Sequence, residues 1–330
     1  MTPSSQPSSA PSSSSVAPLR AAQSRSAHWR HWAFKPPALR SLALLLPVLL
    51  LATGCLQERN SPNAKRVAQT VAALDAVTLE LAYGVGLANR VVAVPRGTLW
   101  PPEATSLPKV GSASEPDLRV LRSIAPRYVL LPAGHDASRA ALEEEGFQVI
   151  EIETQSLGGL RVGIDTLGAA LESSGAAEGL RRRLEITLAP RPIAEGRRVV
   201  ITLGRDAEER DKIRIAREDD WAGELLSRLG AFNPAENLES PFASMQEILE
   251  LQPEAIIELS TGSLDKGELS AEEHNAAWRS ASTEPDQRIP LLYSVTGSHV
   301  LIPGPRLPRT YNQLTEVLQG LPIPEPAVAP

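Results

Sequence analysis

Residues 117–131 read DLRVLRSIAPRYVLL, and residues 245–259 read MQEILELQPEAIIEL. Each stretch places leucine, isoleucine or valine at helical spacing, continues with a proline, and ends in an apolar run typical of a buried strand. The proline marks the end of the helix, because the residue before a proline is disfavoured in the helical conformation. The repeated order of helix, proline and strand predicts two α/β halves of related architecture.

Other strand and helix patterns alternate around these two stretches. Strands are expected at residues 66–73, 90–94, 128–131, 148–152, 198–203, 255–259 and 290–293. Helices are expected at residues 77–87, 117–124, 138–145, 221–229, 245–251 and 307–318. Alternating strands and helices predict mainly parallel sheets, and a crevice between two such halves is a common place for a ligand.

Residues 157–188 contain no proline and carry leucine or isoleucine at helical spacing on both sides of a Ser-Ser-Gly break at 173–175. They predict one long helix, or two collinear helices, ending at Pro-Arg-Pro 190–192. The charge-rich residues 206–220 are interpreted as a solvated loop.

The charge of the chain is divided unevenly. Residues 1–54 contain five basic residues and no acidic one, so they carry +5 of a net charge of −6 and leave −11 for the rest. A basic head on an acidic body is typical of an export signal, and an acidic body argues against nucleic-acid binding. We therefore interpret residues 1–54 as a signal peptide with a disordered basic N-region.

Cys55 is the only cysteine, so the chain can form no internal disulfide. It follows SLALLLPVLLLA (41–52), which is shorter than the roughly 20 residues of a membrane span, and the small residues at 52–54. This arrangement looks like a bacterial lipoprotein box and predicts lipidation of Cys55, with 55–65 as a polar tether. The alternative is a plain signal peptide with a chance cysteine.

Catalytic and metal-binding signatures are missing from the sequence. It contains no nucleophile elbow, no HExxH, no phosphate-binding glycine loop and no cysteine placed as a nucleophile. His135 with Asp136, and His274, have no partners at metal-ligand spacing. We expect a protein that is not an enzyme and that has neither a metal site nor an intrinsic cofactor.

Several ordered motifs resemble one family of transport proteins. RVAQTVAALDAVTLELAYGVGLANRVVAVPRGTLWPP (66–102) and LPKVGSASEPDLRVLRSIAPRYVLL (107–131) resemble the first lobe of the ABC-transporter periplasmic binding proteins for metal chelates, and residues 244–258 with PGPR (303–306) resemble the second. The resemblance runs from about residue 66 to residue 318. It implies a class III periplasmic binding protein, in which two Rossmann-like α/β lobes (66–156 and 191–320) are joined by a single long α-helix (157–190), before a Pro-rich tail (321–330).

The family resemblance also implies a function. It predicts the exported, monomeric substrate-binding lipoprotein of an ABC importer, anchored on the periplasmic side of the membrane. Its ligand would be a metal chelate, namely cobalamin, a ferric siderophore or haem, bound in the cleft between the lobes.

Four residues are the candidate ligand contacts. Trp100 occupies the loop where the family has a ligand-facing aromatic, Phe242 is the candidate second aromatic, His299 lies in a late cleft loop, and Arg306 could pair with a ligand carboxylate. Alternatively, Trp100 packs its loop, His299 is solvated, and Arg306 fixes its loop to the last helix. Three other aromatic residues are expected in the core: Trp221, Trp278 and Tyr293.

The positions at which the family docks onto its permease differ here. The two docking glutamates of the family fall on Arg119 and Gln246. Charge complementarity steers docking, so this difference leaves three interpretations open. The permease partner differs, or Glu115 and Glu247 take the place of the docking glutamates, or the protein keeps the binding fold as a ligand sensor or scaffold.

Overall fold

The computed structural model describes residues 69–205, 212–261, 271–281 and 289–322. By its contacts the chain divides into Met1–Cys55 and Leu56–Pro330, and every described residue belongs to the second unit. The expected signal peptide (1–54), Cys55, the tether (55–65) and residues 323–330 of the tail lie outside the described residues. Within the described ranges, no helix is both long and apolar enough to cross a membrane.

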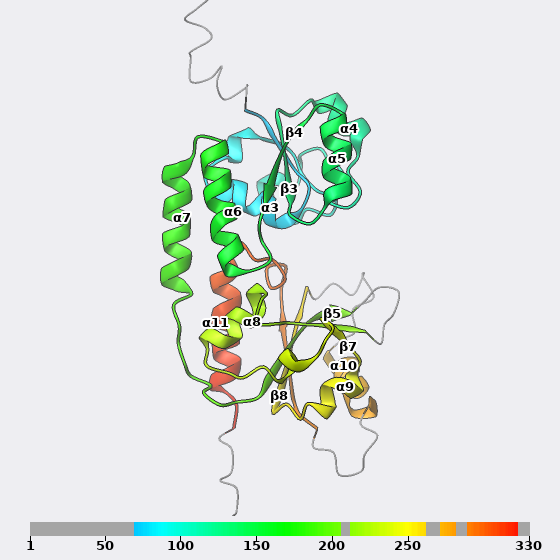
Figure 1. The fold of residues 1–330 in the computed structure, drawn as a ribbon, viewed down its shortest axis with the longest axis vertical. Helices are drawn as coiled ribbons and strands as arrows, with labels where there is room; N and C mark the ends of the chain where they lie inside the picture. Colours follow the sequence, from blue (N-terminus) through cyan, green and yellow to red (C-terminus); the bar gives the residue numbers. More distant parts are fainter. Residues whose placement is uncertain (1–68, 206–211, 262–270, 282–288, 323–330) are drawn as a thin grey trace, which may run out of the picture. The chain divides into compact units, whose positions relative to one another are not determined.

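The first lobe is built on a four-stranded parallel sheet with the order β2-β1-β3-β4 (Figure 1). Its strands are β1 (Val71–Ala73), β2 (Val91–Ala93), β3 (Tyr128–Pro132) and β4 (Gln148–Ile152). Its helices are α3 (Ala76–Gly84), α4 (Leu118–Ile124) and α5 (Asp136–Glu144), with short 3-10 turns η1 (Ala88–Arg90) and η2 (Pro102–Ala104). Val71 and Ala73 pack into one buried cluster with α3, whereas Ala72 and Leu74 pack into another with α4 and α5. The sheet is therefore covered on both faces, as parallel sheets generally are.

The second lobe is built on a five-stranded sheet with the order β7-β6-β5-β8-β9. Its strands are β5 (Val199–Arg205), β6 (Ile213–Ile215), β7 (Phe242–Ala243), β8 (Ala255–Ser260) and β9 (Leu291–Thr296). Its helices are α8 (Trp221–Arg228), α9 (Met245–Glu250), α10 (Ala271–Ala281) and α11 (Leu307–Gln319), with the 3-10 turn η3 (Pro234–Asn237). Strands β5, β8 and β9 are parallel, and β6 and β7 are antiparallel additions at one edge. Helices α8 and α11 share a buried cluster with one face, and α9 and α10 with the other.

The repeated stretches of the sequence fold in the same way, as predicted. Helix α4 is followed by Ala125 with φ +50°, Pro126 and strand β3. Helix α9 is likewise followed by Gln252 with φ +50°, Pro253 and strand β8. A left-handed residue after the last turn lets the chain leave the helix sharply and enter the sheet.

The segment expected as a single long helix (157–190) is two helices, α6 (Leu157–Ala170) and α7 (Ser174–Thr187). Asp165 lies 3.6 Å from Arg181, and Gly168 abuts Ala177, so the helices run antiparallel, side by side (Figure 1). The prediction of one helix or two collinear helices is wrong, because the chain reverses at residues 171–173, where Glu172 has φ +53°. The reversal allows the apolar stripes of both helices to pack into the same buried cluster.

The charge-rich stretch 206–220 is only partly a loop. Residues 206–211 lie outside the described residues, but Ile213 and Ile215 form the buried strand β6 between β5 and β7. Two isoleucines flanking one arginine form too short an alternation to be recognised among so many charges.

Candidate ligand-binding site

Trp100 lies in the loop between β2 and η2 and is 42% exposed. Its neighbour Leu99 is 75% exposed. The guanidinium carbon of Arg306 lies 5.0 Å from the centroid of the Trp100 ring, which is a cation–π distance. Trp100 thus combines an exposed aromatic surface with a contact to a residue of the second lobe.

Arg306 precedes α11 and donates four hydrogen bonds to protein groups. Its Nε donates to Glu80 Oε2 at 2.9 Å and its Nη2 to Glu80 Oε1 at 2.5 Å. Nη2 also donates to the carbonyl oxygen of Ser298 at 3.0 Å, and Nη1 to the Ser298 hydroxyl at 3.2 Å. Of the two interpretations from the sequence, these contacts favour a role in fixing the loop, and they fix it to α3 as well as to the neighbouring turn.

Glu80 is the acidic partner in this arrangement, and sequence reasoning missed it. It lies in the middle of α3, with 3% of its surface exposed. Burial raises the pKa of the Glu80 carboxyl, and the hydrogen bonds and positive charge of Arg306 oppose that rise. The one signal in the sequence was a single acid within the apolar run VTLELAYG (77–84).

His299 is buried, with 2% of its surface exposed. Its Nε2 lies 2.8 Å from the Gln313 side-chain oxygen, and its ring packs against Gly297 so closely that a Cβ there would come within 2.6 Å of Cε1. Because an amide oxygen only accepts, Nε2 donates. Burial lowers the pKa of His299, which favours the neutral ring, and this ring lies against Gln313 of α11.

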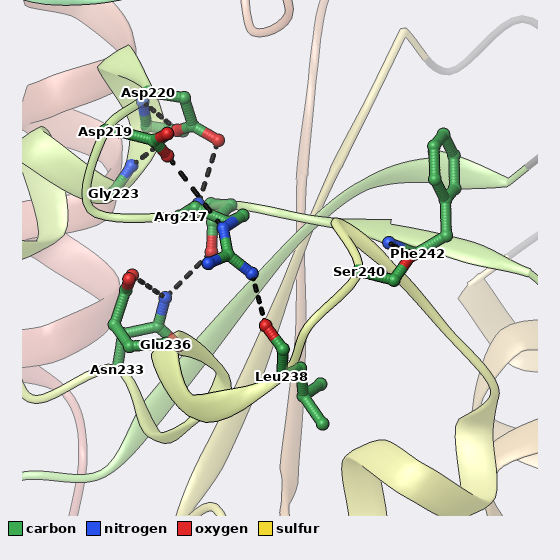
Figure 2. A network of polar contacts seen from close by, with 11 residues as sticks. Arg217, Asp219, Asp220, Gly223, Asn233, Glu236, Leu238, Ser240 and Phe242 are labelled. Atoms are coloured by element: carbon green, nitrogen blue, oxygen red, sulfur yellow. Dashed lines mark hydrogen bonds and ion pairs between the residues drawn. The ribbon is translucent and has the colours of Figure 1, made fainter.

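Phe242 lies on the edge strand β7 and is 38% exposed. Its amide donates to the Ser240 hydroxyl at 3.0 Å, and its ring points away from the polar network around Arg217 (Figure 2). No contact between Phe242 and Trp100 is found among the described residues. The two aromatics are therefore exposed on different lobes.

The polar network of Figure 2 joins the segment between β6 and α8 to the end of η3. The Arg217 amide donates to Asp220 Oδ2 at 2.8 Å, and the Arg217 Nη1 donates to the Leu238 carbonyl at 2.7 Å. Asp220 also accepts from the amides of Ala222 and Gly223 at the start of α8. Because these groups bond to one another, they hold the two segments together.

His135 and Asp136 both contact other protein groups. His135 Nδ1 lies 3.2 Å from the Pro132 carbonyl oxygen, and Asp136 pairs with Arg139 at 3.2 Å. The side chain of His274 lies outside the described residues. Among the side chains that are described, no group of three His, Cys, Asp or Glu residues could hold a metal ion.

Trp221 and Trp278 are buried and Tyr293 packs against the core, as predicted.

The two expected docking positions are on the surface. Arg119 is exposed on α4, with no ion pair among the described residues, and Gln246 is exposed on α9, where its Nε2 donates to Glu250 at 3.1 Å. Glu115 is exposed and lies 3.8 Å from Arg96. Glu247 accepts from the Ser244 amide at 2.7 Å and caps α9, so its carboxylate is partly occupied.

A cavity of about 360 Å³ lies elsewhere, between α6, α7 and α8. Its floor consists of buried apolar residues, namely Leu160, Ile164, Leu184 and Leu188. On its rim, Arg181 pairs with Glu185 at 2.9 Å, and Glu224 accepts the Leu157 amide at 2.8 Å. None of the predicted site residues lines it.

Residues 71–275 match the model of a protein family described as "Periplasmic binding protein". The chain belongs to the periplasmic binding protein family. Among its relatives, the vitamin B12-binding protein of Vibrio cholerae is 25% identical over 226 residues, which cover 64% of this chain and 80% of that protein. The "Uncharacterized ABC transporter substrate-binding lipoprotein YvrC" of Bacillus subtilis is 24% identical over 270 residues, covering 76% and 80% respectively.

Solved structures agree with the fold of this periplasmic binding protein. The vitamin B12-binding protein BtuF of Vibrio cholerae matches with a TM-score of 0.59 at 21% identity, over 76% of this chain and 96% of that chain. The haem-binding protein HutB of Vibrio cholerae matches with a TM-score of 0.60 at 19% identity, over 76% and 99%. The predicted α/β class is therefore confirmed, and the protein is an ABC-transporter type of substrate-binding protein rather than an enzyme.

Proposed function

We propose that this protein captures a metal chelate (cobalamin, a ferric siderophore or haem) between lobes at 66–156 and 191–320, as the substrate-binding lipoprotein of an ABC importer. The observation that carries the proposal is Trp100, an exposed aromatic ring supported by Arg306. Flat macrocycles and catecholates stack well on such a surface. The names of the vitamin B12-binding and haem-binding relatives support the same ligand class.

Phe242 is the candidate second ligand contact, because it is an exposed aromatic on the other lobe. An exposed ring from each lobe suits a flat ligand held between two surfaces. His299 and Arg306 are better assigned to positioning, since their polar groups already bond to protein.

A titration tests this proposal. The chain from Leu56 onward, which is one compact unit, would be titrated with cyanocobalamin, haemin and ferric enterobactin while tryptophan fluorescence and the melting temperature are followed. One chelate should quench the fluorescence and raise the melting temperature, as a ligand that binds only the native state does. The absence of both effects with all three chelates would remove the proposed ligand class.

We further propose that the mature protein is a monomer held by lipid on Cys55 at the periplasmic side of the membrane. Two acyl chains anchor a protein stably, whereas one chain binds only marginally. In cells expressing the full chain, Cys55→Ala should move the protein from the membrane fraction to the soluble fraction. Retention of the variant in the membrane fraction would argue for a different anchor.

A second candidate function is a ligand sensor or scaffold without an ordinary permease. It is favoured by Arg119, an exposed cation at a position where the resembling family carries a docking glutamate. Co-purification of the full chain with a permease and its ATPase from the native membrane would decide for the importer, and retention of chelate binding without such partners would decide for the sensor.

A further inference from the structure

The guanidinium group of Arg306 joins three elements that are far apart in the sequence. It pairs with Glu80 of α3, donates to Ser298 in the turn after β9, and lies 5.0 Å from the Trp100 ring centroid. The side chain of Arg306 is 17% exposed and that of Glu80 is 2% exposed, so water competes little for these bonds. The position of the guanidinium plane is therefore determined by protein contacts.

Glu80 gives this arrangement a rigid base. Its neighbours Leu79 and Leu81 are fully buried, and the first turn of α3 is capped by Asp75, which accepts the Thr78 amide at 2.8 Å. A carboxylate on a buried, capped helix has little freedom to move. Two parallel bonds to a guanidinium fix orientation as well as distance.

We infer that Glu80 and Arg306 are positioning residues for Trp100, which hold the indole ring in the orientation that receives the ligand. The inference rests on the proposed function, which assigns Trp100 to the ligand. An exposed ring beside an exposed Leu99 would otherwise sample several rotamers, and ordering it on binding costs affinity. Because Glu80 fixes Arg306, the Trp100 ring is already ordered in the folded protein, and the entropy of ordering it does not reduce the affinity for the ligand.

The orientation of Trp100 can be measured without any ligand. In the chain from Leu56 onward the tryptophans are Trp100, Trp221 and Trp278, and the last two are buried. The difference in fluorescence between the wild type and Trp100→Phe is the emission of Trp100, and acrylamide quenching of this difference therefore reports on the exposure of Trp100. We expect Glu80→Gln and Arg306→Lys to raise the quenching constant about twofold, because the ring loses its cation–π partner or the anchor of that partner.

Glu254→Gln is the matched control. Glu254 pairs with Arg197 at 2.6 Å in another partly buried ion pair, whose side chains are 25% and 15% exposed. This substitution should lower stability and leave the Trp100 quenching constant unchanged. Arg306→Lys preserves the positive charge facing Glu80 and is expected to fold, so the test can still be made if Glu80→Gln unfolds.

Affinity provides the second readout. With whichever of haemin, cyanocobalamin or ferric enterobactin binds, Arg306→Lys should weaken binding about fivefold, and this loss should vanish in a Trp100→Ala background. Unchanged quenching in folded Arg306→Lys, or a loss that persists in the Trp100→Ala background, would overturn the inference. If quenching changes while the wild type binds none of the three chelates, positioning stands and the proposed ligand class fails.

Discussion

Glu80 and Arg306 are 226 residues apart in the chain, and their side chains meet in a two-point ion pair. The pair connects helix α3 of the first lobe to the residue that precedes α11. Because Glu80 is almost completely buried, removing its partner leaves a charge with no solvent to stabilise it. Stability and the presentation of Trp100 therefore depend on the same contact.

Arg306→Ala should lower the free energy of unfolding by about 3–5 kcal/mol, the usual cost of removing one partner of a buried pair. Urea denaturation of the chain from Leu56 onward measures it. Replacing both partners, as Glu80→Leu with Arg306→Met, should recover most of the loss, because no charge is then left unpaired. A single-variant loss below about 1 kcal/mol, the scale of exposed ion pairs, would mean that solvent reaches the pair.

The contact between α6 and α7 predicts opposite outcomes at two helical glycines. A Cβ on Gly168 would lie 2.5 Å from the Ala177 Cβ, whereas a Cβ on Gly179 meets nothing within 4 Å. Gly179→Ala should stabilise the protein by about 1 kcal/mol through helix propensity, and Gly168→Ala should destabilise it by about 1–3 kcal/mol through overpacking.

Thermal unfolding of the two glycine variants measures this difference. Ala177→Gly provides the internal control, because it removes the opposing methyl group and should relieve part of the damage caused by Gly168→Ala. Stabilisation by Gly168→Ala alone would contradict the antiparallel contact.

Much of the fold could be predicted from local sequence. The order of helix, proline and strand at 117–131 and 245–259 correctly gave two α/β lobes, because each element is defined by its own periodicity and its own proline. The hairpin of α6 and α7 could not be predicted in this way. Apolar spacing specifies which face of a helix is buried, and it says nothing about the direction of the next helix.

The candidate site could be predicted only in part. Trp100 was found as an aromatic residue in a loop, and it is indeed exposed. The role of Arg306 depends on Glu80, and no local pattern connects residues at such a separation. His299 lies in the predicted turn, but its burial depends on Gln313 of α11, a contact that only the tertiary structure brings about.

Trp100→Ala should weaken chelate binding by about 1–3 kcal/mol, or roughly fivefold to more than a hundredfold, because it removes the exposed stacking surface. Fluorescence is unsuited to this variant, so calorimetry or ligand absorbance should be used. Ile186→Ala is the control, because Ile186 is an exposed apolar residue on α7, outside the candidate site. Equal effects of the two substitutions would argue against a specific ligand surface at Trp100.

Arg119→Glu with Gln246→Glu should strengthen binding to a permease that presents arginines to its receptor, by about 1–3 kcal/mol. Both positions are exposed, on α4 and α9, so the substitutions should leave folding intact. Pull-down with the permease of a vitamin B12 system measures the effect, and Arg182→Glu, an exposed charge reversal on α7, is the control. A gain that appears equally with Arg182→Glu would reflect net charge alone.

His299 predicts a specific loss of stability on mild acidification. Burial lowers its pKa from the ordinary value of 6.5, so between the two values the unfolded chain binds a proton that the native ring does not. The stabilising contribution is complete above pH 6.5 and is lost as the pH falls through the lower native value. Protonation would also place a charge in a buried site.

The measurement is the urea midpoint of wild type and His299→Gln from about pH 8 to about pH 5, a range that brackets the ordinary histidine pKa. Buried carboxyls with raised pKa values, including those of Asp75 and Asp220, act in the opposite direction but are common to both proteins. The difference between the two curves therefore isolates the imidazole. We expect the wild type to lose its advantage as the pH falls, and parallel curves would show that the ring is protonated as readily in the native state as in the unfolded chain.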